Sequence, residues 1–179
     1  VAELARYFLD SVPDEPETQF IPASPVADEP SCMQIVHEVA RAAGLSVDVR
    51  VEPRLAAAAA TGDKLIFLAQ RPFGVREAVR IAVHEVLAHL TAAANGRSQP
   101  LRLLELGTAG SFSDQEGVAL HLEWESGYFD GRRLRILAAR VVATDRMHAG
   151  ASFGEVAREL VRDEGFTVAD AVAIAERAF

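Results

Sequence analysis

The sequence predicts a mainly helical α+β fold, with a small sheet in the N-terminal half of the chain. Two observations carry this prediction. Alternating valines and short apolar runs, separated by turn residues, are confined to residues 46–69, and this pattern is typical of strands. From Val75 onward, apolar residues recur at helical spacing, and glycines divide this part into segments of helical length.

Length and composition set the limits of the prediction. The chain has 179 residues, of which 50% are hydrophobic and 25% charged, as in an ordinary globular domain. No run approaches the roughly 18 apolar residues that a membrane-spanning helix needs. We recognise no signal peptide at the start of the chain and therefore expect a cytoplasmic protein.

The first 30 residues are interpreted as an N-terminal arm or linker, and residues 31–179 as the functional domain. The stretch Val12–Pro30 is rich in proline and acidic residues, which favours extended chain without secondary structure. Ordered structure is expected from Ser31, which follows Pro30 and can cap a helix that runs to Gly44.

The predicted sheet covers Ser46–Ala69 and has two to four strands. Val47, Val49 and Val51 alternate with charged residues, which predicts a half-buried strand. The runs Leu55–Ala60 and Lys64–Ala69 flank Gly62 and predict a hairpin.

The helical part begins with a strong helix over Val75–Ala94, for which Asn95-Gly96 is a good C-terminal stop. Ser113 with Glu116, and Ser152 with Glu155, have capping-box spacing. The further predicted helices are Leu101–Leu106 closed by Gly107, Ser113–Ser126 stopped by Gly127, Arg132–His148, Ser152–Glu164 and Thr167–Ala178.

Charge and cysteine content exclude several classes of function. The net charge is −8 and no basic stripe is visible, which argues against nucleic acid or an anionic membrane as partner. Cys32 is the single cysteine, so neither a disulfide framework nor a zinc site made mainly of cysteines is possible.

The sharpest chemical feature is the hexapeptide His84-Glu85-Val86-Leu87-Ala88-His89 within the Val75–Ala94 helix. Zinc proteases carry H-E-x-x-H, in which the histidines share one helix face. Here the spacing is i, i+5, and in a regular helix these positions differ by roughly 140°. A π-bulge would return both imidazoles to one face. The neighbouring residues are almost all apolar, and buried ionisable groups need a partner. The hexapeptide therefore predicts a metal site on an irregular helix.

Two histidines leave a zinc ion short of ligands. Glu116, in the segment Gln115-Glu116-Gly117-Val118-Ala119, is one candidate for the third ligand. The capping box with Ser113 is an alternative role for Glu116, and Glu123, two helical turns further on, is a rival ligand.

These motifs together resemble a known family. H-E-x-x-x-H at His84–His89, followed by Gln115–Ala119, is similar to the Q-E-G-L-A metallopeptidases. That family includes the microtubule-associated tyrosine carboxypeptidases and bacterial flavohemoglobin expression-modulating proteins with the QEGLA motif. The match covers roughly Lys64 to Phe179. The chain has Leu87-Ala88 where the family usually has Gly-Thr, and Val118 where it usually has Leu.

The resemblance implies a zincin-like metallopeptidase domain of a bacterial protein. Zinc would be held by His84, His89 and Glu116, and Glu85 would be the general base. Tyrosine specificity on tubulin tails is not carried over, because family members usually extend further at both ends.

The resulting prediction is a zinc metallocarboxypeptidase that acts on a peptide or protein C-terminal tail. Arg140, an arginine in an apolar run, is a candidate for binding the terminal carboxylate. The sheet edge near Leu65–Ala69 would position the peptide. A metal-binding pseudoenzyme and a metal-dependent hydrolase of a non-peptide substrate are the alternatives.

Overall fold

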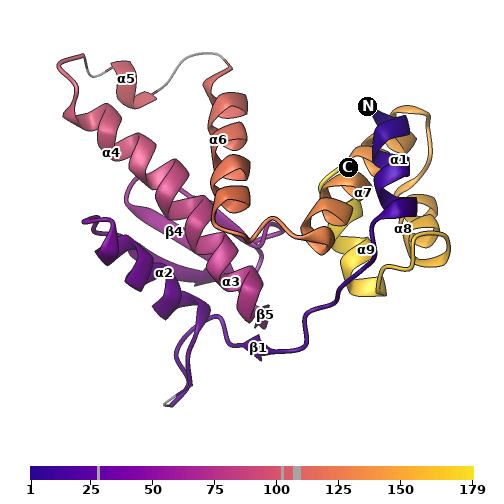
Figure 1. Ribbon diagram of the computed structural model, residues 1–179, viewed down its shortest axis with the longest axis horizontal. Coiled ribbons are helices and arrows are strands. Elements are labelled where there is room, and N and C mark those ends of the chain that lie inside the picture. Colours follow the sequence, from indigo (N-terminus) through magenta and orange to yellow (C-terminus); the bar gives the residue numbers. More distant parts are fainter. Residues whose placement is uncertain (28, 102, 107–109) are drawn as a thin grey trace. The chain divides into compact units, whose positions relative to one another are not determined.

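The computed structural model describes residues 1–27, 29–101, 103–106 and 110–179 (Figure 1). Its helices and short strands confirm the mainly helical α+β prediction. The chain divides into two compact units. The sheet unit comprises Glu17–Phe129, and the helical unit combines Val1–Pro16 with Asp130–Phe179. The predicted boundary at residue 30, between an N-terminal arm and the functional domain, stays a prediction.

The sheet unit contains the three-stranded sheet that the valine pattern predicts. Strand β4 (Leu65–Ala69) is central, between β2 (Asp48–Glu52) and β3 (Ala59–Thr61). The pair β2 and β4 is parallel, whereas β3 and β4 form the antiparallel hairpin. The expectation that Leu65–Ala69 lies at a sheet edge is therefore wrong. The hairpin places β3 outside β4, so β3 is one edge strand of this sheet and β2 is the other.

The N-terminal stretch of the sheet unit is more structured than its composition predicts. Strand β1 (Phe20–Ile21) pairs antiparallel with β5 (Phe73–Gly74). The side chain of Ile21 is buried in the core. The prediction that Val12–Pro30 lacks secondary structure is thus wrong at β1, because a distant strand supplies its hydrogen bonds.

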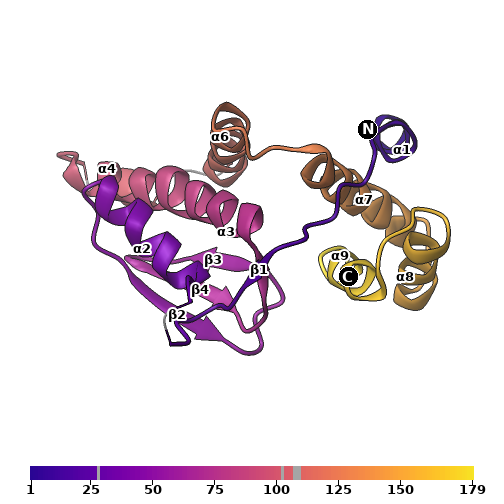
Figure 2. The same cartoon turned by 60° about the horizontal axis from the view of Figure 1, so that its bottom comes forward.

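Helices cover one side of the sheet (Figure 2). Helix α2 (Cys32–Ala42) begins at the predicted cap, where Ser31 and Gln34 form a capping box. It packs against α3 (Val75–Ala82) and against the π-helix η1 (Val83–Leu90). Fully buried side chains from these helices and from the strands form the core of the unit: Val36, Ile66, Leu68, Phe73 and Val86.

The predicted helix over Val75–Ala94 is one continuous rod made of α3, η1 and α4 (Thr91–Ser98). It runs past the predicted stop at Asn95-Gly96. Gly96 is buried, and a Cβ there would lie 2.7 Å from the carbonyl oxygen of Leu104. The glycine therefore allows α5 (Leu103–Leu106) to approach α4 closely, and it does not end the helix. The predicted closure at Gly107 lies outside the described residues.

Helix α6 (Ser111–Glu125) begins two residues before the predicted start. Its N-cap is Gly110, which has a φ of 93° and makes no side-chain cap. Ser113 therefore lies inside the helix, and the predicted capping box with Glu116 is wrong. The helix ends before Gly127, as predicted, and the φ of 76° at that glycine suits a C-terminal stop.

The helical unit joins the two ends of the described chain. Helix α1 (Ala2–Ser11), which the sequence analysis does not predict, packs on α7 (Gly131–His148). The guanidinium of Arg135 donates hydrogen bonds to the carbonyls of Leu9, Val12 and Glu164. Helices α8 (Phe153–Arg162) and α9 (Val168–Ala175) complete the unit. The predicted capping box of Ser152 and Glu155 is confirmed. No helix among the described residues is long and apolar enough to span a bilayer.

Candidate metal centre

The π-helix η1 brings the two histidines of the hexapeptide together. All eight residues of Val83–Leu90 are π-helical, so the predicted irregularity is confirmed and extends beyond a single bulge. The N–H and the hydroxyl of Thr91 both donate to the carbonyl of Val86, and the N–H bond is an i→i+5 bond. As a result, the Nε2 atoms of His84 and His89 lie 3.3 Å apart.

Glu116 completes the cluster from a second helix. Helix α6 packs against η1. The Glu116 Oε1 atom lies 3.3 Å from the Nε2 atom of His89, and its Oε2 atom lies 3.5 Å from the Nε2 atom of His84. The carboxylate thus faces both imidazoles. The Glu116 side chain is 58% exposed, whereas the imidazoles are largely buried, so the cluster is open to solvent on the Glu116 side.

The spacing of these atoms fits a metal ion. Ligands of a tetrahedral zinc ion, bonded at about 2.0–2.1 Å, lie about 3.3–3.4 Å from one another. In the cluster, the two Nε2 atoms lie 3.3 Å apart, and each lies 3.3 or 3.5 Å from a different oxygen of Glu116, so the cluster is of this size. Two imidazoles and one carboxylate are also a donor set that zinc accepts in catalytic sites. His84, His89 and Glu116 are therefore able to hold an ion.

Cys32 does not take part in such a site. Its side chain is fully buried in α2. Burial, together with the nearby charge of Glu77, raises the pKa of the Cys32 thiol to about 12. The thiol therefore stays protonated at neutral pH, whereas metal binding requires the thiolate.

The Nδ1 atoms of both histidines have acceptors behind them. The Nδ1 atom of His84 lies 2.7 Å from Glu123 Oε1, and that of His89 lies 3.4 Å from Gln115 Oε1. Both acceptors are oxygens, an arrangement that favours the Nδ1–H tautomer and leaves the lone pair of Nε2 for a metal ion. Glu123, considered above as a rival ligand, thus contacts the opposite side of His84.

Glu85 follows His84 in η1, and its side chain is buried. Its Oε2 atom accepts a hydrogen bond of 2.7 Å from the hydroxyl of Thr61, in the edge strand β3. The base candidate is thus held by the sheet, one residue away from His84.

Two residues that contact the site, Gln115 and Thr61, are not predicted from the sequence to do so. Gln115 belongs to the Q-E-G segment, and its position beside Glu116 is the signal that could have pointed to it. Thr61 gives no such signal, because its contact with Glu85 depends on how the hairpin packs on η1. Arg140 lies in α7, in the helical unit. Its role in binding a terminal carboxylate stays a prediction.

Fold and site together define a mainly helical α+β protein with a two-histidine, one-glutamate cluster on a π-helix. The family model of the microtubule-associated tyrosine carboxypeptidases matches residues 1–179. The chain therefore belongs to this family, as its motifs indicate, and membership implies a carboxypeptidase-like peptidase. Searches of curated proteins and of solved structures find no significant match.

Proposed function

We propose that the protein is a zinc-dependent metallocarboxypeptidase. The observation that carries the proposal is the cluster of His84, His89 and Glu116, in which the two Nε2 atoms lie 3.3 Å apart and each lies within 3.5 Å of a Glu116 oxygen. Glu85 lies next to this cluster in the chain and points to a different partner. A purely structural metal site has no use for a carboxylate at that position, which favours catalysis over a metal-binding pseudoenzyme.

The three proposed ligands have distinct roles. His84 and His89 present neutral Nε2 atoms, because their Nδ1 protons are directed to Glu123 and Gln115. Glu116 adds one negative charge from the solvent side. A zinc ion held there would polarise the scissile carbonyl and make a water molecule acidic near neutral pH.

Glu85 is proposed to move the proton. Its carboxylate accepts a proton from the attacking water and delivers it to the nitrogen of the leaving amino acid. Thr61 keeps the Oε2 atom of Glu85 in place through the 2.7 Å hydrogen bond. Because one oxygen is held in this way, the other oxygen of Glu85 is the one that we assign to proton transfer.

The edge strand β3 is proposed to bind the peptide. It pairs with β4 on one side, and an extended peptide can add to the other side through main-chain hydrogen bonds. Thr61 belongs to β3 and contacts Glu85, so a peptide on this edge would lie close to the base. The proposed substrate is the C-terminal tail of a peptide or protein.

Metal analysis combined with peptide digestion tests the proposal. The purified chain is analysed for bound metal and incubated with a peptide library that has free C-termini, and the products are read by mass spectrometry. The matched control is the same library with amidated C-termini. We expect about one zinc per chain and loss of C-terminal residues from the free library only, abolished by a chelator. Zinc binding without cleavage would support the pseudoenzyme, and chelator-resistant cleavage would exclude the mechanism.

A further inference from the structure

Arg80 lies one helical turn before His84, on the same face of the α3–η1 rod. Arg76 lies a further turn upstream on that face. Arg80 contacts the C-terminal part of α6, and Arg76 contacts the chain just after that helix. The guanidinium of Arg80 lies 3.4 Å from Glu123 Oε1, and that of Arg76 donates a 3.0 Å hydrogen bond to the carbonyl of Gly127. The Arg80 contact leads to the candidate metal centre, because Glu123 also contacts His84.

Glu123 needs such a partner. Its side chain is 0% exposed, and a buried carboxylate is costly unless charge and hydrogen bonds compensate it. The same oxygen, Oε1, lies 2.7 Å from the Nδ1 atom of His84 and 3.4 Å from Arg80. Arg80 and His84 thus hold one carboxylate oxygen from two sides. A displacement of that oxygen would change the orientation of the imidazole.

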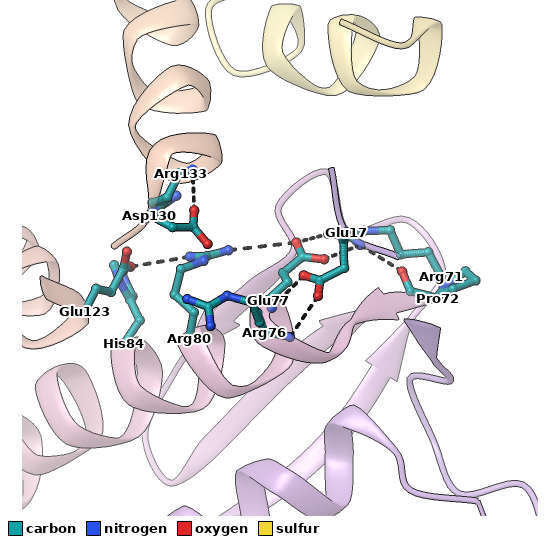
Figure 3. Close-up of polar contacts among 10 residues, drawn as sticks. All are labelled: Glu17, Arg71, Pro72, Arg76, Glu77, Arg80, His84, Glu123, Asp130 and Arg133. Carbon is teal, nitrogen blue, oxygen red and sulfur yellow. Dashed lines mark hydrogen bonds and ion pairs between the residues drawn. The ribbon is translucent and has the colours of Figure 1, made fainter. Parts of the chain in front are cut away.

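Arg80 is itself fixed by charges on its other side. Its Nη2 atom lies 3.9 Å from Glu77 Oε1, and Glu77 makes two hydrogen bonds of 2.7 and 3.0 Å with Arg71 (Figure 3). Burial opposes ionisation of Glu77. The hydrogen bonds and charge of Arg71, with the charge of Arg80, outweigh it and hold the pKa of Glu77 below its usual value.

Arg71, Glu77, Arg80 and Glu123 therefore form a row of alternating charge, which ends at His84, a proposed metal ligand. The Arg80 side chain is 15% exposed and Glu123 is fully buried. Solvent consequently screens the inner part of this row far less than a surface ion pair. Exposure increases outward, towards Arg71.

We propose that Arg80 is a positioning residue, which holds Glu123 against the Nδ1 atom of His84 and so keeps Nε2 directed at the metal. The inference rests on the proposed zinc site. Arg80 reaches the cluster through its contact with Glu123, so its effect passes through that carboxylate. A group bonded directly to a metal-binding histidine, as Glu123 is, typically changes metal affinity about 10–100-fold, and Arg80 acts one contact further out, so its effect should be smaller.

The test measures zinc affinity by competition with a chromogenic chelator, using the full chain and zinc alone. The variants are R80M and R80K. R76M is the matched control, because Arg76 also connects the α3–η1 rod to the C-terminal end of α6, through the carbonyl of Gly127. We expect R80M to bind zinc several-fold more weakly, a smaller loss than the roughly 10–100-fold of a direct partner, and R80K to recover part of the loss. R76M is expected to keep the wild-type affinity. Thermal unfolding of each variant checks that the chain is folded.

A double-mutant cycle shows whether Arg80 acts through Glu123. We expect E123Q to weaken zinc binding, and R80M to add little to that loss. Full additivity, equal losses in R80M and R76M, or a wild-type affinity in R80M would each overturn the inference. If R80M does not fold, R80K with E123Q gives the same cycle. Absence of zinc binding in the wild-type chain would instead refute the proposed function.

Discussion

Replacing Glu85 with glutamine isolates proton transfer from metal binding and from folding. Glutamine keeps the shape of the side chain, and its amide oxygen can accept the hydrogen bond that Thr61 donates to Oε2 over 2.7 Å. It cannot accept the proton of a water molecule. Glu116 is not placed to substitute, because each of its oxygens faces an imidazole, at 3.3 and 3.5 Å. We therefore expect the fold and the metal affinity to be retained.

The expected loss of activity for E85Q is about 10²–10⁴-fold in kcat/KM, the usual contribution of a general base. This corresponds to about 3–5 kcal/mol in the barrier. The assay is mass-spectrometric release of the C-terminal residue at saturating zinc. T61V is the companion variant: it keeps the base and removes the hydroxyl, so we expect a smaller loss. Turnover of E85Q within a few-fold of wild type would refute the assignment of Glu85.

Three further predictions concern the ligand, the packing and the response to acid. E116Q is expected to weaken zinc affinity in chelator competition with little change in thermal stability, because the side chain is 58% exposed; unchanged affinity would contradict ligation. G96A is expected to destabilise by about 1–3 kcal/mol, since its Cβ would lie 2.7 Å from the Leu104 oxygen. G117A, which meets nothing within 4 Å, should be neutral or stabilising by up to about 1 kcal/mol in chemical denaturation. The pKa of Glu77 is lower in the folded chain than its usual value of 4.5. Ionised Glu77 therefore stabilises the fold when the pH is above 4.5, and this stabilisation is lost as the pH falls through the folded pKa. Wild type and E77Q should therefore differ in unfolding free energy at pH 7 and converge in acid; a constant difference would contradict the ion pair.

Much of the site is predictable because its signals are local. The i, i+5 spacing of His84 and His89 is incompatible with a shared face of a regular helix, so it predicts a distortion directly. The extent of that distortion is not local. A π-helix over Val83–Leu90 depends on how η1 packs on α6 and on the sheet, and the spacing alone requires only one bulge.

The missed features depend on residues far apart in the chain. Glu17 accepts hydrogen bonds from the N–H groups of Arg76 and Glu77, and so caps α3 from about 60 positions away. Gly96 has the local signature of a helix stop, yet its role is set by the backbone of Leu104. Spacing within one segment cannot distinguish these cases, because the competing contact comes from another element.

The helical unit is built from two segments that lie far apart in the chain, and this affects how the chain folds during synthesis. The sheet unit is one contiguous segment, Glu17–Phe129, so it can fold once that segment has left the ribosome. Helix α1 is synthesised before the sheet unit, but it packs on α7, which is synthesised after that unit. More than a hundred residues are therefore translated before α7 can cover the face of α1 that carries Ala5 and Leu9. That interval lasts about 6–25 s at 5–20 residues per second, and transiently exposed apolar surface of this kind is prone to aggregation.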